Sequence, residues 1–204
     1  MRILFQGDSI TDANRDKRNY HELGSGYPKY AAELIESEHP DIDFEFINFG
    51  ISGNRTCQLF DRLYDDGIVF APDIISILIG INDIWHRHDF GKIETTDAQI
   101  QLNYRCILER LRRQTNSKIV MLQPFLLDSH GIDHLREDFA RLLPIVDALA
   151  AEFADVYVPL NEYFSEALKT QPAPLYYSAD GVHPNAEGAK FIAEHYKNAI
   201  NKLL

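Results

Sequence analysis

Residues 74–83 read IISILIGIND, and this stretch decides the fold class. The run from Ile74 to Ile79 is almost continuously apolar and rich in β-branched side chains, which is typical of a β-strand. Because the run does not alternate between apolar and polar residues, we expect helices to cover both of its faces. The stretch therefore predicts a central strand of a parallel sheet.

Similar runs recur along the chain, with helix-like segments between them. The expected strands cover residues 3–5, 44–49, 74–79, 119–123 and 156–158. The expected helices cover residues 26–38, 55–66, 96–114, 133–153, 161–169 and 185–204. Alternating β and α units predict an α/β fold, a three-layer α/β/α sandwich around a five-stranded parallel sheet. A chain of 204 residues suits one hydrophobic core, so we expect a single domain over residues 1–204.

Composition limits the partners that this chain can have. A formal net charge of −11 argues against nucleic acid, whose binding normally needs a basic surface. No stretch approaches the roughly 18 apolar residues of a membrane span, so we expect no membrane partner. The apolar run after Met1 is too short for a signal-peptide core, and Cys57 and Cys106 are the only cysteines. These features favour a cytoplasmic protein that acts on a small, neutral or weakly charged substrate.

Residues that directly follow the strands are the best candidates for chemistry, because parallel α/β sheets bind ligands at the carboxyl ends of their strands. After the first strand, Gly7-Asp8-Ser9 places a hydroxyl at a strand-to-helix turn. Ser9 is a candidate nucleophile, and it is equally a candidate helix cap. The Gly-x-Ser-x-Gly elbow of the ordinary α/β-hydrolases is absent.

Three later segments offer groups that could act with this hydroxyl. Gly50 and Gly53 follow the second strand, and Asn82 follows the third. Asp180 lies three residues before His183, so a single turn can bring its carboxylate to the imidazole Nδ1. Each segment also has a purely structural interpretation, since Asn is common in turns and His183 could be a hydrogen-bonded loop residue.

Taken together, the four blocks resemble the SGNH, or GDSL, hydrolase family, and they occur in the family's order from Ser9 to His183. The resemblance implies a flavodoxin-like sheet and a serine hydrolase that works through an acyl-enzyme. It implies that Ser9 is the nucleophile, His183 the general base and Asp180 the carboxylate that orients it. It also implies three oxyanion donors: the N–H of Ser9, the N–H of Gly53 in preference to Gly50, and the Asn82 amide.

The family needs no cofactor, and we expect neither a metal nor an organic cofactor here. Four of the histidines outside the motifs, His86, His88, His130 and His134, show no metal-ligand spacing with an acidic or cysteine partner.

A closer resemblance connects this chain to bacterial intracellular acetylxylan esterases of the same family. It is carried by residues 7–12, 24–27, 48–54 and 79–85. It implies removal of acetyl groups from xylo-oligosaccharides or related sugars. Asp8 and Trp85 are then expected to line the substrate site, with Trp85 either stacking on a sugar ring or serving only as a packing residue.

Other activities suit the same machinery. They are a general short-chain carboxylesterase, a lysophospholipase and a thioesterase, and a less favoured alternative is a carbohydrate-binding protein without turnover. The resembling esterases often assemble, so we expect a homo-oligomer, with Phe60, Tyr64 and Phe90 as candidate contacts.

Overall fold

A five-stranded parallel sheet forms the centre of the molecule in the computed structural model, which describes residues 1–204. The strands are β1 (Arg2–Gly7), β2 (Glu45–Asn48), β3 (Ile74–Leu78), β4 (Lys118–Leu122) and β5 (Val156–Val158). Their order across the sheet is β2-β1-β3-β4-β5, and every neighbouring pair is parallel. The predicted number and direction of strands are confirmed.

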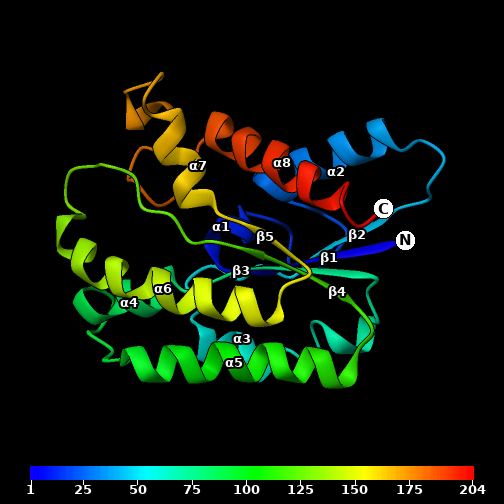
Figure 1. Cartoon of the computed structure of the whole chain (residues 1–204), viewed down its shortest axis with the longest axis horizontal. Helices are drawn as coiled ribbons and strands as arrows, with labels where there is room; N and C mark the ends of the chain where they lie inside the picture. Colours follow the sequence, from blue (N-terminus) through cyan, green and yellow to red (C-terminus); the bar gives the residue numbers. More distant parts are fainter.

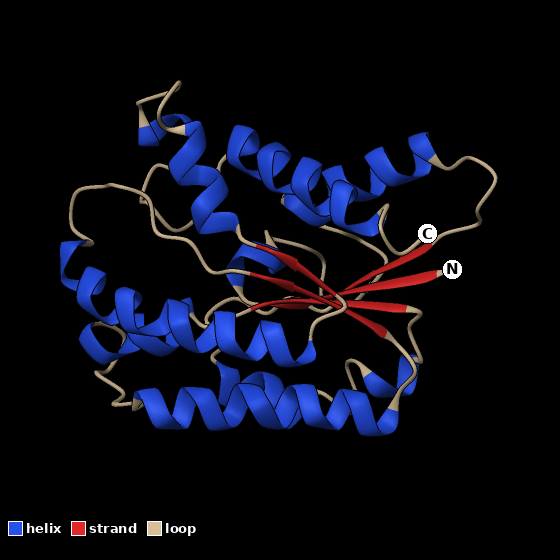
Figure 2. Ribbon diagram, viewed as in Figure 1, coloured by secondary structure: helices blue, strands red, loops and turns tan.

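Helices cover both faces of the sheet (Figure 1, Figure 2). One layer holds α2 (Tyr27–Glu38), α7 (Leu160–Ala167) and α8 (Ala186–Ile200). The other holds α3 (Thr56–Arg62), α4 (Ile81–His88), α5 (Asp97–Gln114) and α6 (Arg136–Phe153). A single turn, α1 (Ser9–Asp12), follows β1, and short 3-10 helices cover Ile68–Phe70, Asp133–Leu135 and Pro174–Tyr176. This is the three-layer sandwich that the sequence predicts.

The central strands are buried on both faces, as their apolar sequences require. All five residues of β3 are buried, including the polar Ser76. The Ser76 hydroxyl donates to the Leu4 carbonyl oxygen at 3.2 Å and accepts from the Tyr196 hydroxyl at 3.3 Å. Because buried polar groups are costly only when unpaired, Ser76 is tolerated within an apolar strand. The Tyr196 hydroxyl thereby also links α8 to the middle of the sheet.

Two helices are absent from the sequence-based prediction, and the end of a third differs. No helix was expected between residues 79 and 96, but α4 starts directly after Gly80, whose φ of 127° favours glycine. The four-residue α1 was also not predicted, because one turn is too short to show helical periodicity. The final helix ends at Ile200 rather than at residue 204.

The strand order predicts a ligand site at the carboxyl ends of β1 and β3. The chain runs outward from β1 to β2 and then crosses back to β3 on the other side, so the topology changes direction between β1 and β3. Ligands of flavodoxin-like folds bind beyond the carboxyl ends of strands at this switch point. Ser9 begins α1 directly after β1, and Asn82 lies in the first turn of α4 after β3. The topology therefore places two of the candidate residues at the expected position.

Two of the three aromatic residues that are candidate oligomer contacts are exposed, and the homo-oligomer itself stays a prediction. Tyr64 and Phe90 are 49% and 65% exposed, whereas Phe60 is half-buried against the core.

None of the helices combines the length and apolar character needed to cross a lipid bilayer.

Candidate active site

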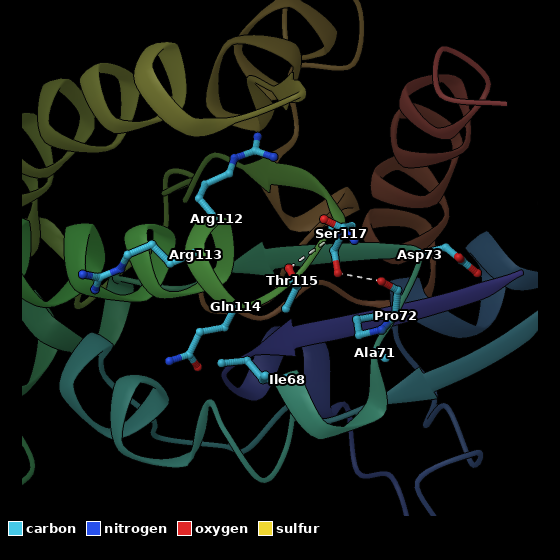
Figure 3. A pocket seen from close by; sticks show the side chains of 10 residues that line it. Ile68, Ala71, Pro72, Asp73, Arg112, Arg113, Gln114, Thr115 and Ser117 are labelled. Carbon is cyan, nitrogen blue, oxygen red and sulfur yellow. Dashed lines mark hydrogen bonds between the residues drawn. The ribbon is translucent and has the colours of Figure 1, made fainter.

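Two cavities lie at opposite ends of the strands, one at the amino ends and one at the carboxyl ends. One of about 520 Å³ lies at the amino ends of β3 and β4, and Figure 3 shows the side chains around it. Its polar groups serve the fold: the Ser117 hydroxyl donates to the Pro72 carbonyl oxygen at 2.6 Å, and Arg112 pairs with Asp155 at 2.8 Å. The residues around it include no serine that contacts a histidine, so it offers no nucleophile with an adjacent base.

The other cavity, of about 370 Å³, lies at the carboxyl edge. Its size falls within the range of small-molecule sites. Its lining is mostly small and polar and consists of Ser9, Ile10, Ala13, Asn14, Ser25, Gly26, Ser52, His183 and Pro184. Ser9 and His183, which the sequence singles out, therefore share one cavity. Asn14, Ser25 and Ser52 were not predicted, because nothing in the sequence indicates which loops meet here.

Ser9, His183 and Asp180 form a continuous hydrogen-bonded line. The Ser9 Oγ lies 2.8 Å from His183 Nε2, and His183 Nδ1 lies 2.6 Å from Asp180 Oδ2. Ser9 is the first residue of α1, whose cap is the Asp8 carboxylate, so the Ser9 hydroxyl is not used to cap the helix. This geometry suits proton transfer from a serine hydroxyl to an oriented imidazole.

The Asp180 carboxylate is held by its own turn. Asp180 Oδ1 accepts the N–H groups of Val182 and His183 at 2.9 and 2.7 Å. Burial opposes its charge, but the hydrogen bonds from the His183 ring and from these backbone N–H groups outweigh burial and hold the pKa of Asp180 well below its usual value. The hydrogen bond to Asp180 in turn raises the pKa of His183, against the opposing effect of burial. The pair therefore favours a carboxylate that stabilises a protonated imidazole.

Three N–H donors lie on the segments that follow β1, β2 and β3. The Ser9 N–H belongs to the first turn of α1, where N–H groups have no acceptor within the helix. The Gly53 N–H makes no hydrogen bond within the protein. The Asn82 amide donates to the Asn54 carbonyl oxygen at 3.1 Å, which occupies one of its two N–H groups. The Gly50 N–H donates to Asn48 Oδ1 at 2.8 Å, so Gly50 is not available as a donor.

Asp8 corrects an expectation. The sequence places it beside Ser9 and predicts a substrate contact, but the residue is only 1% exposed. Its Oδ1 accepts the Ile10 N–H at 3.0 Å and caps α1, while Oδ2 is buried without a partner. Burial raises the pKa of Asp8 to about 7. Asp8 therefore stabilises the first turn of α1, which carries Ser9, and does not line the cavity.

Asp83 connects two of the donor segments. Its carboxylate is buried and accepts the N–H and the hydroxyl of Thr56 at 2.9 and 2.7 Å. Thr56 is the first residue of α3, so Asp83 satisfies the start of that helix from the first turn of α4. Burial raises the pKa of Asp83 to about 6, against these hydrogen bonds.

Trp85 borders the candidate nucleophile from the α4 side. Its ring centroid lies 5.8 Å from that of His183, and its Nε1 donates to Asp89 Oδ2 at 2.9 Å. The exposed Phe90 packs edge-on against it at 5.7 Å. Trp85 therefore lies beside the catalytic candidates, as expected, and Phe90 extends the aromatic surface although its sequence position gives no sign of this. No group of three or more His, Cys, Asp and Glu side chains is arranged to hold a metal ion.

Comparison with known proteins gives matches along nearly the whole chain. The model of the GDSL-like lipase/acylhydrolase family matches residues 5–191. The acetylxylan esterase of Geobacillus stearothermophilus is 31% identical over 207 residues, which cover 98% of this chain and 93% of that protein.

Solved structures give similar results. A protein from Parabacteroides merdae described as a GDSL-like lipase has a TM-score of 0.92 at 34% identity, covering 98% of this chain and 95% of its own. The Geobacillus esterase has a TM-score of 0.88 at 29% identity, covering 98% of this chain and 93% of its own. Three of its solved variants, described as catalytic mutants, carry alanine in place of a serine, an aspartate and a histidine, with the aspartate three positions before the histidine. Another variant is described as an acetyl-xylooligosaccharide esterase.

Proposed function

Because the chain belongs to the GDSL-like lipase/acylhydrolase family and is a carboxylester hydrolase, we propose that it removes acetyl groups from xylo-oligosaccharides or related sugars. The observation that carries the hydrolytic part is the contact of Ser9 Oγ with His183 Nε2, backed by Asp180. The similarity to an acetylxylan esterase along nearly the full chain supports the acetylated sugar. The small, polar lining of the Ser9 cavity suits sugar hydroxyls better than a long acyl chain.

The proposed reaction has two halves. In the first, His183 Nε2 takes the Ser9 proton while Oγ attacks the acetyl carbonyl carbon, and the tetrahedral intermediate expels the sugar oxygen, which receives that proton from His183. This leaves acetyl-Ser9 and the free sugar hydroxyl. In the second half, a water molecule gives a proton to His183 and attacks the acetyl group. His183 returns its proton to Ser9 Oγ as acetic acid leaves, the acid then loses its remaining proton to the solvent, and the enzyme is regenerated.

Negative charge develops on the carbonyl oxygen in both halves. The N–H groups of Ser9 and Gly53 and the free N–H of the Asn82 amide are the donors that stabilise it in this proposal. Such donors act because they are already in place before the charge forms.

The role of Gly53 gives a prediction with a matched control. Gly53 and Gly131 have φ angles of 81° and 92°, and a Cβ added at either would meet no atom within 4 Å. Replacing either with alanine should lower the free energy of unfolding by a similar amount, about 1–2 kcal/mol, because L residues disfavour this backbone region. Only Gly53→Ala should also displace a donor and lower kcat, by up to about 100-fold. Thermal unfolding and kcat on p-nitrophenyl acetate measure the two effects, and an equal loss of kcat in both variants would contradict the assigned donor.

A substrate panel tests the proposed function. We expect the purified protein to release acetate from acetylated xylo-oligosaccharides and to cleave p-nitrophenyl acetate faster than the octanoate. Faster cleavage of the octanoate, with acetylated sugars left intact, would instead favour a lysophospholipase or a general esterase. A preference for acyl thioesters would favour a thioesterase. Binding of the sugars without acetate release would favour the non-catalytic alternative.

Trp85 is the residue proposed to contact the sugar. Trp85→Ala should raise KM for acetylated xylo-oligosaccharides by about 2- to 10-fold, the effect of losing an aromatic contact of about 0.5–1.5 kcal/mol. The same variant should leave KM for p-nitrophenyl acetate, which has no sugar ring, nearly unchanged. Equal increases for both substrates would assign Trp85 to packing of the site instead.

A further inference from the structure

Arg62 lies at the end of α3 and contacts the segments that carry the donors. Its side chain is 13% exposed. Nη2 donates to the carbonyl oxygen of Gly7, two residues before Ser9, at 3.0 Å. Nη1 donates to the carbonyl oxygen of Phe49, directly after β2, at 2.7 Å. Nε donates to Asn54 Oδ1, in the residue after Gly53, at 2.8 Å. One guanidinium therefore joins the carboxyl ends of two strands to the loop that holds Gly53.

The same connection continues to Asn82. The backbone carbonyl oxygen of Asn54 accepts one N–H of the Asn82 amide at 3.1 Å. Asn54 is thus held by Arg62 through its side chain and holds Asn82 through its backbone. Consequently, Gly53 and Asn82 are each connected to Arg62 through Asn54, and Ser9 is connected to it through Gly7 and Asp8.

The acceptors of Arg62 are unusual for a buried cation. Its only carboxylate partner is Asp66 at 3.3 Å, and the other acceptors are neutral, including Gln6 Oε1 at 2.8 Å. A buried charge is costly, so a stabilising role alone would favour a closer ion pair. The planar guanidinium instead supplies donors in fixed directions to several carbonyl oxygens, which the single ammonium of lysine cannot do.

We propose that Arg62 is a positioning residue that sets the spacing of the oxyanion donors. It does not line the Ser9 cavity, and it acts through the Gly7, Phe49 and Asn54 oxygens. This inference rests on the proposed function, because it concerns the donors that stabilise the tetrahedral intermediate. Its consequence is that the loss of Arg62 should weaken binding of the transition state more than binding of the substrate.

The test compares three variants on p-nitrophenyl acetate. Arg62→Lys keeps the positive charge but loses the planar guanidinium with its several N–H donors. We expect kcat to fall about 10- to 100-fold and KM to stay within about 2-fold. The loss should be smaller than the roughly 100- to 1,000-fold fall in kcat that follows removal of an oxyanion donor itself, which is the largest effect to be expected. Asn54→Ala removes only the Nε contact and should lower kcat to a smaller extent. Asp66→Ala removes the carboxylate partner without touching the donor segments. It should lower the melting temperature and leave kcat within about 2-fold of the wild-type value.

A second readout separates positioning from general destabilisation. Methylboronic acid adds to a serine nucleophile and forms a tetrahedral adduct that resembles the intermediate. Its inhibition constant should rise in parallel with the loss of kcat/KM in Arg62→Lys and Asn54→Ala, and stay constant in Asp66→Ala. An unchanged inhibition constant in Arg62→Lys, or a loss of activity that follows melting temperature in all three variants, would overturn the proposal.

The design also separates this proposal from the proposed function. If Ser9→Ala retains activity, the serine mechanism fails whatever Arg62 does. If Ser9→Ala is inactive while Arg62→Lys has wild-type kcat, only the positioning role fails. Should Arg62→Lys not fold, as judged by circular dichroism, Asn54→Ala alone decides, because it leaves the guanidinium and its strand contacts in place.

Discussion

Replacing Ser9 or His183 with alanine is expected to lower kcat by about 10⁶-fold, the effect seen when the nucleophile or the base of a serine hydrolase is removed. The physical reason is that the two side chains act as one unit across the 2.8 Å contact between Ser9 Oγ and His183 Nε2. The double variant should therefore be no slower than either single variant. Turnover of p-nitrophenyl acetate measures all three.

Covalent labelling gives an independent reading of the same pair. A fluorophosphonate should label the wild-type protein at Ser9 and should label neither Ser9→Ala nor, at any comparable rate, His183→Ala. Ser165→Ala is a suitable control, since its hydroxyl donates only to the Asn161 carbonyl oxygen in α7, and it should label normally. Full-rate labelling without His183 would disprove the proposed mechanism.

Asp180→Asn is the second substitution with a large expected effect, about 10⁴-fold in kcat. The amide keeps an oxygen that can accept the Val182 and His183 N–H groups, so the turn should survive. Its NH₂ group, however, can donate to His183 Nδ1 and leave the ring proton on Nε2, facing Ser9. A ring in that tautomer cannot accept the serine proton.

The same variant should change the pH profile. His183 must be neutral to act as a base, so kcat/KM rises with pH through the pKa of His183, which lies above its usual 6.5 because of the hydrogen bond to Asp180. Without that carboxylate, the pKa of His183 should fall and the acidic limb should move to lower pH. Asp133→Asn, an exposed carboxylate paired with Arg136, changes the net charge equally and should leave the limb in place. An unshifted limb in Asp180→Asn would show that Asp180 does not control the base.

The sheet could be predicted from sequence because burial on both faces leaves a simple signature. Runs such as Ile74 to Ile79 have no alternation, and a turn residue such as Gly80 follows them. Ser9 and Asn82 directly follow β1 and β3, so their position at the carboxyl ends of the strands could be predicted together with the fold. Asp180 and His183 precede α8 instead, and their pairing with Ser9 was expected from the order of the four motifs and the family that they resemble.

The remaining features depend on tertiary contacts that no local pattern records. The short helix α4 carries His86, Arg87 and His88 in its last turn and lacks a long apolar stripe, so the sequence pattern does not indicate a helix there. Asp8 is adjacent to Ser9 in sequence, yet capping α1 turns its carboxylate into the core. Arg62 gives no sequence signal either, because its acceptors at Gly7 and Phe49 are determined by where α3 packs.

The separation of Ser9 and His183 along the chain affects the protein during its synthesis. They are 174 residues apart, and the His183 loop directly precedes α8, which packs on α2. A growing chain therefore carries the proposed nucleophile long before it carries the proposed base. Because a domain generally folds as a unit, we expect the nascent protein to remain inactive until its last helix docks. Esterase activity should thus report completed folding, and C-terminal truncation should abolish the activity even where most of the sheet has formed.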